Sequence, residues 1–199
     1  MLMDGRPQND SFGGAVCANA GLSMLVTGYE TYCESRWCEL ESEGIGLDAA
    51  RVLERFGTRD QRERLSCGQD IHAVLGEQVS SGRCAPTLVA IINFQNFESR
   101  KRAWNLGYGI RFGTDLELPS QLLERLQRLL AYRHRIVHVS PLIGLLNHPQ
   151  VPPEDPEFSG PAFLEAAEKT FERFISALHR RTLELCPTSS GEEESHTTS

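Results

Sequence analysis

The stretch LPSQLLERLQRLLAYRHRIVHVSP, residues 118–141, has a clear helical pattern. At about 100° per residue, its apolar side chains fall within an arc of roughly 140°, and most of its charged side chains fall on the other side. The apolar arc holds Leu118, Leu122, Leu123, Leu126, Leu129, Leu130, Ile136 and Val137. We therefore predict an amphipathic helix that begins at Pro119-Ser120 and ends near Val139, before Pro141.

The C-terminal part of this predicted helix departs from the pattern. Arg133 falls near the middle of the apolar arc, and His134 and His138 fall at one edge of it. An arginine on a buried face is costly unless its charge is paired or the face opens onto a cleft. One interpretation is a structural ion pair with a carboxylate of another helix, for which Glu30 or Glu34 is a candidate. The other is a polar site in which the arginine holds an anion and a histidine moves a proton.

The rest of the chain is also predicted to be almost entirely helical. Apolar residues recur at helical spacing over residues 14–41, after Asp48, over about 69–79, from 96 to 106 and from Pro161 onwards. The stretch TLVAIINF, residues 87–94, fits either a buried strand or part of a helix. The predicted fold class is all-α, a bundle of about five to six helices.

Composition and length indicate one domain of a globular protein. The chain has 199 residues, of which 40% are hydrophobic and 24% charged. We predict a flexible N-terminus over residues 1–13, a helical domain over 14–186 and a disordered acidic tail over 187–199. The net charge of −7 argues against a general nucleic-acid coat protein, although basic groups that converge at one site still bind RNA.

Cysteine usage and hydropathy exclude several other classes. The six cysteines include no C-x-x-C pair and no zinc-ligand spacing, so we expect free thiols, no metal and no cofactor. No apolar run approaches the roughly 20 residues that span a bilayer. The N-terminal sequence lacks the pattern of a secretory signal, and the expected location is the cytoplasm.

The segment Arg133-His134-Arg135-Ile136-Val137-His138 resembles the R-x(4–6)-H signature of the HEPN superfamily, in which a polar residue typically follows the arginine. The upstream stretches GLSMLVTGYETYCES and INFQNFESRKRAWNLGYGIRF are similar to HEPN proteins too, so the resemblance covers about residues 14–186. Two other pairs fit the spacing, but an apolar residue follows the arginine in each: Arg128 to His134 and Arg173 to His179.

The resemblance implies a HEPN-like helical bundle that forms a homodimer. It also implies a metal-independent endoribonuclease whose site is composed of the motifs of two protomers. Arg133 would then bind and stabilise the phosphate as charge builds on it. His138 would act as general base or acid, and His134 would orient the site or assist proton transfer. The expected products are a 2′,3′-cyclic phosphate and a 5′-hydroxyl.

Further residues are candidates for supporting roles. The basic residues predicted to guide the RNA backbone are Arg128, Arg135, Arg100, Lys101 and Arg102. The alternative for each of these residues is that it is a solvated surface charge with no role in RNA binding. Glu30 and Glu34 lie one helical turn apart, and family members often carry a polar residue on this helix that supports the site. Solvent exposure is the expectation for at least one of the two.

Three functional hypotheses remain open from the sequence. The first is a ribonuclease of the toxin or phage-defence type, with RNA as substrate and an antitoxin or other protein as partner. The second is a non-catalytic HEPN module that binds a protein, a nucleotide or RNA through the same groove. The third is an unrelated helical protein in which Arg133 forms a structural ion pair.

Overall fold

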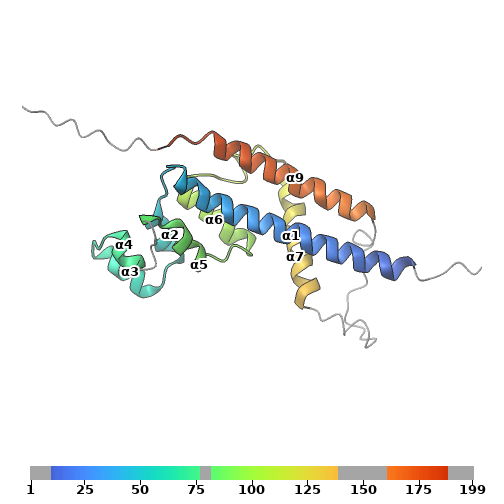
Figure 1. Cartoon of the computed structure of the whole chain (residues 1–199), viewed down its shortest axis with the longest axis horizontal. Coiled ribbons are helices and arrows are strands. Elements are labelled where there is room, and N and C mark those ends of the chain that lie inside the picture. Colours follow the sequence, from blue (N-terminus) through green and yellow to red (C-terminus); the bar gives the residue numbers. More distant parts are fainter. Residues whose placement is uncertain (1–9, 77–81, 139–160, 188–199) are drawn as a thin grey trace, which may run out of the picture. The chain divides into compact units, whose positions relative to one another are not determined.

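A computed structural model of the chain describes residues 10–76, 82–138 and 161–187, and these ranges contain eight α-helices and no strand (Figure 1). The predicted all-α class is therefore confirmed for the described residues, but the predicted number of about five to six helices is wrong, because these ranges already contain eight. The helices are α1 (Asp10–Ser42), α2 (Ala49–Phe56), α3 (Arg59–Ser66), α4 (Ile71–Leu75), α5 (Ala85–Ile91), α6 (Phe97–Tyr108), α7 (Ser120–His138) and α9 (Pro161–Leu183).

The chain divides into two compact units. Unit 1 takes its described residues from Met1–Tyr32 and Leu116–Ala177, and unit 2 takes them from Cys33–Asp115 and Leu178–Ser199. The N-terminal parts of α1 and α9 therefore belong to unit 1, and their C-terminal parts belong to unit 2. The candidate motif on α7 lies in unit 1, whereas α6 lies in unit 2.

In unit 1, α1 and α9 run side by side in the same direction (Figure 1). Near their N-terminal ends the backbone of Gly21 lies against the side chain of Leu164. Further along, the ring of Tyr29 packs between Phe171 and Phe174, with both centroid separations at 5.3 Å. This spacing keeps aromatic rings in favourable tilted contacts and fills the core of the unit.

Helix α7 completes unit 1 with the leucine face that its sequence predicts. Leu122, Leu126, Leu129 and Leu130 are all buried. The helix runs across the direction of α1 and α9 in Figure 1. The predicted start at Ser120 is confirmed, because α7 spans Ser120–His138, whereas the predicted end near Val139 lies outside the described residues.

In unit 2 the end of α1 packs against α6 and the segment before it. Trp37 makes edge contacts with Phe94 and Tyr108, at centroid separations of 5.8 and 5.5 Å. The Tyr108 hydroxyl donates a 2.7 Å hydrogen bond to the Trp37 carbonyl. A Cβ at Gly107 would lie 2.9 Å from Leu47 and 3.1 Å from Trp37, so only glycine permits this close approach.

The short helices of unit 2 begin at side-chain caps. The carboxylate of Asp48 accepts from the Arg51 amide at the start of α2, as predicted. Thr58 and Gln61 form a reciprocal capping box at the start of α3. Helix α2 packs against α3, α5 and α6, and α3 packs against α4.

The ambiguous stretch 87–94 is helical through Ile91 and then extended. Two features select the helix. Pro86 stands in its first turn, where its fixed backbone angle fits a helix. The Glu41 carboxylate of α1 accepts from the Cys84 and Ala85 amides, at 2.9 and 2.8 Å, and so satisfies donors that the helix start leaves open.

Other boundaries differ from the predictions. Helix α1 begins at Asp10, four residues before the predicted start, so residues 10–13 are helical. The helix predicted over 69–79 is α4, Ile71–Leu75, and residues 77–81 lie outside the described ranges. Helix α3 was not predicted. The remainder of the predicted flexible N-terminus, residues 1–9, and the tail from 188 also lie outside the described residues.

Candidate functional site

Arg133 interrupts the leucine face of α7 in the structure as it does in the sequence. Its side chain is half-buried. Its Nε is buried, and no hydrogen-bond partner for this atom exists among the described residues. Leaving a buried donor without a partner costs about 1–3 kcal/mol. The protein therefore holds a cationic donor on an apolar helix face at a cost in stability.

The expected structural ion pair of Arg133 is not found in the part of the chain that the structure describes. The ion pairs there join other residues, and none joins Arg133 to a carboxylate. Of the two candidate carboxylates, Glu34 is exposed and belongs to unit 2. Glu30 is half-buried and belongs to unit 1.

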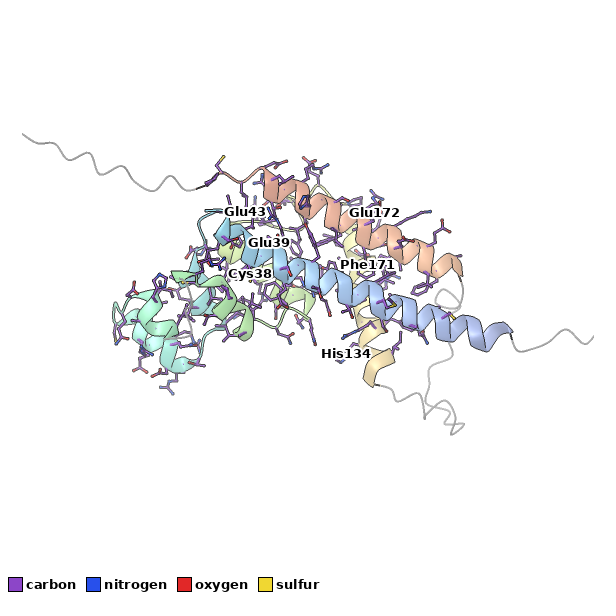
Figure 2. The ribbon with its side chains drawn as sticks, in the orientation of Figure 1. Cys38, Glu39, Glu43, His134, Phe171 and Glu172 are labelled. Atoms are coloured by element: carbon purple, nitrogen blue, oxygen red, sulfur yellow. The ribbon has the colours of Figure 1, made fainter. Side chains whose placement is uncertain are left out.

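The two histidines of the motif are on the same helix as Arg133. His134 is exposed on α7, where Figure 2 labels it. His138 is the last residue of α7, and its side chain lies outside the described set, as does that of Arg135. The structure thus places the predicted catalytic residues at the C-terminal end of one helix.

The predicted RNA-guiding residues divide between the two units. Arg128 is exposed on α7 in unit 1. Arg102 is exposed and Lys101 partly exposed on α6 in unit 2, where Lys101 lies 3.8 Å from the Glu98 carboxylate. These surface positions leave Arg128, Lys101 and Arg102 as candidates for contacts with a polyanion.

Arg100 departs from the expected surface cluster. Its side chain is fully buried in unit 2 and donates to the Phe94 carbonyl. On α6 it shares a face with Ala103, Trp104 and Gly107, which are buried at spacings of three, four and seven residues. In this position Arg100 does not reach an RNA backbone, which corrects the expectation of a three-residue basic surface.

A cysteine–histidine pair in unit 2 was not singled out from the sequence. The Cys84 sulfur lies 3.7 Å from Nδ1 of His72. Burial, together with the nearby Glu41 and Asp70 carboxylates, raises the pKa of the Cys84 thiol to about 11. A nucleophilic cysteine needs the opposite shift. The pair is therefore a structural contact with a protonated thiol, not an activated nucleophile.

A second arginine in the described structure was also missed by the sequence interpretation. Arg36 is 5% exposed, and its Nε donates to the Thr182 hydroxyl at 3.0 Å. Its other nitrogens donate to Glu43 Oε2 at 2.9 Å and to Glu39 Oε2 at 3.2 Å. The hydrogen bond from Arg36 lowers the pKa of the Glu43 carboxyl. The Arg36 guanidinium therefore links α1 to α9 within unit 2 and has a structural role.

The described residues contain no group of three or more histidine, cysteine or acidic side chains arranged to hold a metal ion. None of the described helices has the length and apolar character needed to span a bilayer. Comparison with protein-family models, with curated proteins and with solved structures finds no match to this chain.

Proposed function

We propose that this chain is a metal-independent endoribonuclease of the HEPN type, with a HEPN-like helical bundle and a site composed of α7 from two copies. The observation that carries the proposal is the buried, unpartnered Nε of Arg133 on the leucine face of α7. A phosphate that binds there supplies the missing acceptor, and a guanidinium binds phosphate oxygens in a bidentate geometry.

The chemistry follows from the residue types of the motif. RNA cleavage requires a base for the ribose 2′-hydroxyl, a cation for the charged phosphorane and an acid for the 5′-oxygen. Histidine has an unperturbed pKa near 6.5, so His138 is suited to proton transfer at neutral pH. Arg133 stabilises the phosphorane charge, and the exposed His134 orients the substrate or assists the proton transfer.

A second copy of the chain supports the site for a geometric reason. Positions 133 and 138 are five residues apart on α7, which places them about 140° apart around the helix axis. One helix therefore does not direct both positions at a single phosphate. Two facing copies of α7 bring Arg133 of one chain opposite His138 of the other.

The experiment that tests this proposal is cleavage of total tRNA and a structured mRNA by the purified protein in EDTA, with product ends mapped. We expect cutting that leaves a 2′,3′-cyclic phosphate and that His138→Ala loses. A substrate with a 2′-deoxyribose at the cleaved position should resist, because it lacks the attacking hydroxyl. Arg125→Ala, at an exposed position of the same helix, is the matched control and should cut normally.

Two results would count against the proposal. Cutting by His138→Ala at the wild-type rate would remove the proposed proton-transfer residue. No cutting by a folded wild-type dimer would favour the second hypothesis, a non-catalytic HEPN module that binds a protein, a nucleotide or RNA. Binding of the same RNAs without turnover would then be the measurement that follows.

A further inference from the structure

Two glycines of α1 in unit 1 have different surroundings. A Cβ at Gly21 would lie 2.9 Å from the Leu164 side chain, so the close packing of α9 accounts for that glycine. A Cβ at Gly28 would meet nothing within 4 Å. Glycine is a poor helix former because its backbone loses the most freedom on folding. Among the described residues of unit 1, no contact accounts for this unfavourable residue within the 33-residue helix α1.

Gly28 lies in an apolar groove between α1 and α9. The groove has a volume of about 360 Å³, and its lining is mainly apolar, with Met24, Tyr29 and Ile175 among the contributing residues. Met24 is 76% exposed, which is unusual for a large apolar side chain. The missing side chain at Gly28 leaves the floor of this groove open to an incoming group.

The groove carries negative charge along its α9 side. Glu168 and Glu172 line it one helical turn apart, and both are exposed. Neither carboxylate lies within ion-pair distance of a cation among the described residues, although both help to raise the pKa of Lys169, whose ammonium group pairs with Glu165 at 2.7 Å. Figure 2 labels Glu172 and Phe171 on this stretch of α9. Two available carboxylates beside an apolar floor favour an occupant that is apolar in the middle and basic at its edge.

We propose that this groove docks a basic amphipathic helix of another protein. An aliphatic side chain of that helix sits over Gly28 and against Met24. Lysine or arginine residues spaced three or four apart pair with Glu168 and Glu172. The lack of a side chain at position 28 lets the partner helix approach α1 closely.

Charge argues against the other occupants. A second copy that docked through the same face would bring its own Glu168 and Glu172 against these carboxylates. Residues 139–160 of this chain contain three acidic residues and no lysine or arginine, so that segment does not complement the groove either. RNA and anionic lipid are repelled by the same carboxylates. The proposal is independent of RNA cleavage, because the groove lies on α1 and α9 and its test measures binding.

The probe is a synthetic fluorescent peptide of about 15 residues, long enough to form a helix on binding. It carries leucines on one stripe and lysines on both sides of that stripe. Fluorescence anisotropy with the full chain should give saturable binding that weakens with salt. Two control peptides, one with glutamate for lysine and one with the same composition but scattered leucines, should bind at least about tenfold more weakly.

Substitutions in the groove separate docking from general charge attraction. Gly28→Gln fills the floor, so it should weaken peptide binding about tenfold or more while the melting temperature stays equal or rises, because glutamine is the better helix former. Glu168→Gln with Glu172→Gln should weaken binding and flatten its salt dependence. Ser35→Gln, at an exposed position of α1 that does not line the groove, is the matched control and should bind normally.

Three results would overturn the proposal. Equal binding of the scattered-leucine peptide would mean general charge attraction. Unchanged binding by Gly28→Gln would place the peptide elsewhere. A dimer of the wild type that Gly28→Gln converts to monomer, measured by analytical ultracentrifugation, would make a second copy the occupant.

Discussion

Arg36 and Arg133 are the same residue type in two regions of the molecule, and the protein uses them differently. Arg36 in unit 2 is nearly fully buried, and Thr182, Glu39 and Glu43 accept from its guanidinium. Arg133 in unit 1 is half-buried, and its Nε has no acceptor among the described residues. The first arrangement is that of a structural residue. Under the proposed function, the second is that of a residue whose acceptor is a bound phosphate.

The comparison explains why an arginine on a leucine face is not by itself a sign of function. A buried guanidinium whose nitrogens all have acceptors contributes to the stability of the fold. A buried guanidinium that lacks an acceptor lowers that stability. Arg36 is the more deeply buried of the two, but what distinguishes a structural arginine from an unsatisfied one is the set of acceptors around its guanidinium.

The largest expected effect concerns the composite site. Arg133→Ala and His138→Ala should each lose cleavage by about a hundredfold or more, since transition-state charge stabilisation and proton transfer each contribute on that order. An equimolar mixture of the two variants, refolded together, should regain cleavage, because a mixed dimer keeps one Arg133 and one His138 on different chains. The measurement is the initial rate of RNA cutting before and after mixing.

The control for this mixture is each variant refolded alone, which should stay inactive. A mixture that stays inactive while forming mixed dimers would indicate a site within one chain. That result would contradict a site formed by two α7 helices that face each other, but it would not exclude a ribonuclease.

The next effect is on stability, at Arg36. Arg36→Met should lower the free energy of unfolding by about 2 kcal/mol, because the Thr182 hydroxyl loses its donor and two carboxylates lose their cation. The figure is reduced from that of a buried ion pair because Glu39 and Glu43 are 55% and 49% exposed. Urea titration measures it. Arg51→Met, at a 60% exposed arginine 3.9 Å from Asp48, should change stability by less than about 0.5 kcal/mol.

A third arginine, Arg111, interacts with Asp115, and we expect this interaction to make a smaller, pH-dependent contribution to stability. The Arg111 amide donates to Asp115 at 2.8 Å, and with the Arg111 and Thr114 side chains it lowers the Asp115 pKa to about 2. Because the folded pKa lies below the unfolded value near 3.9, this stabilisation is complete above about pH 5 and is lost as pH falls through about 2.

Asp115→Asn should therefore lower stability by about 1 kcal/mol at neutral pH, a figure discounted for solvent screening. The difference from wild type should shrink as the pH falls from about 4 to 2. Urea titrations at several pH values measure it. Asp60→Asn, whose carboxylate is 79% exposed and 4.0 Å from Arg64, is the control and should show no comparable trend. A constant difference across this range would contradict the assigned role of Asp115.

The sequence predicts helices where apolar periodicity or a cap is strong, as in α7 and α2. It misses α3, RDQRERLS, because no residue of that helix is buried and its start depends on the Thr58–Gln61 capping box. It leaves residues 87–94 open because the cap that selects the helix comes from Glu41, more than 40 positions earlier. Long-range caps of this kind are not visible in a local pattern.

The candidate site shows the same limit. The position of Arg133 on the leucine face follows from helix geometry, and the structure agrees with it. Arg100 was placed at the surface because Arg-Lys-Arg resembles a basic patch, yet the spacing of Arg100 to Ala103, Trp104 and Gly107 already marks a buried face. Sequence periodicity does not predict which groups accept hydrogen bonds from a buried arginine. The acceptors of Arg36 come from α1 and α9, and the missing acceptor of Arg133 appears only in the folded chain.

If Arg133 serves a bound phosphate and not the fold, its replacement should remove activity without lowering stability. Arg133→Met keeps the length of the side chain and removes its unpartnered donor. The claim predicts that this variant loses RNA cleavage in EDTA while its free energy of unfolding stays equal to wild type or rises by about 1 kcal/mol. Arg125→Met is the exposed control and should keep both properties. A fall of several kcal/mol in Arg133→Met would instead identify a structural ion pair and contradict the account.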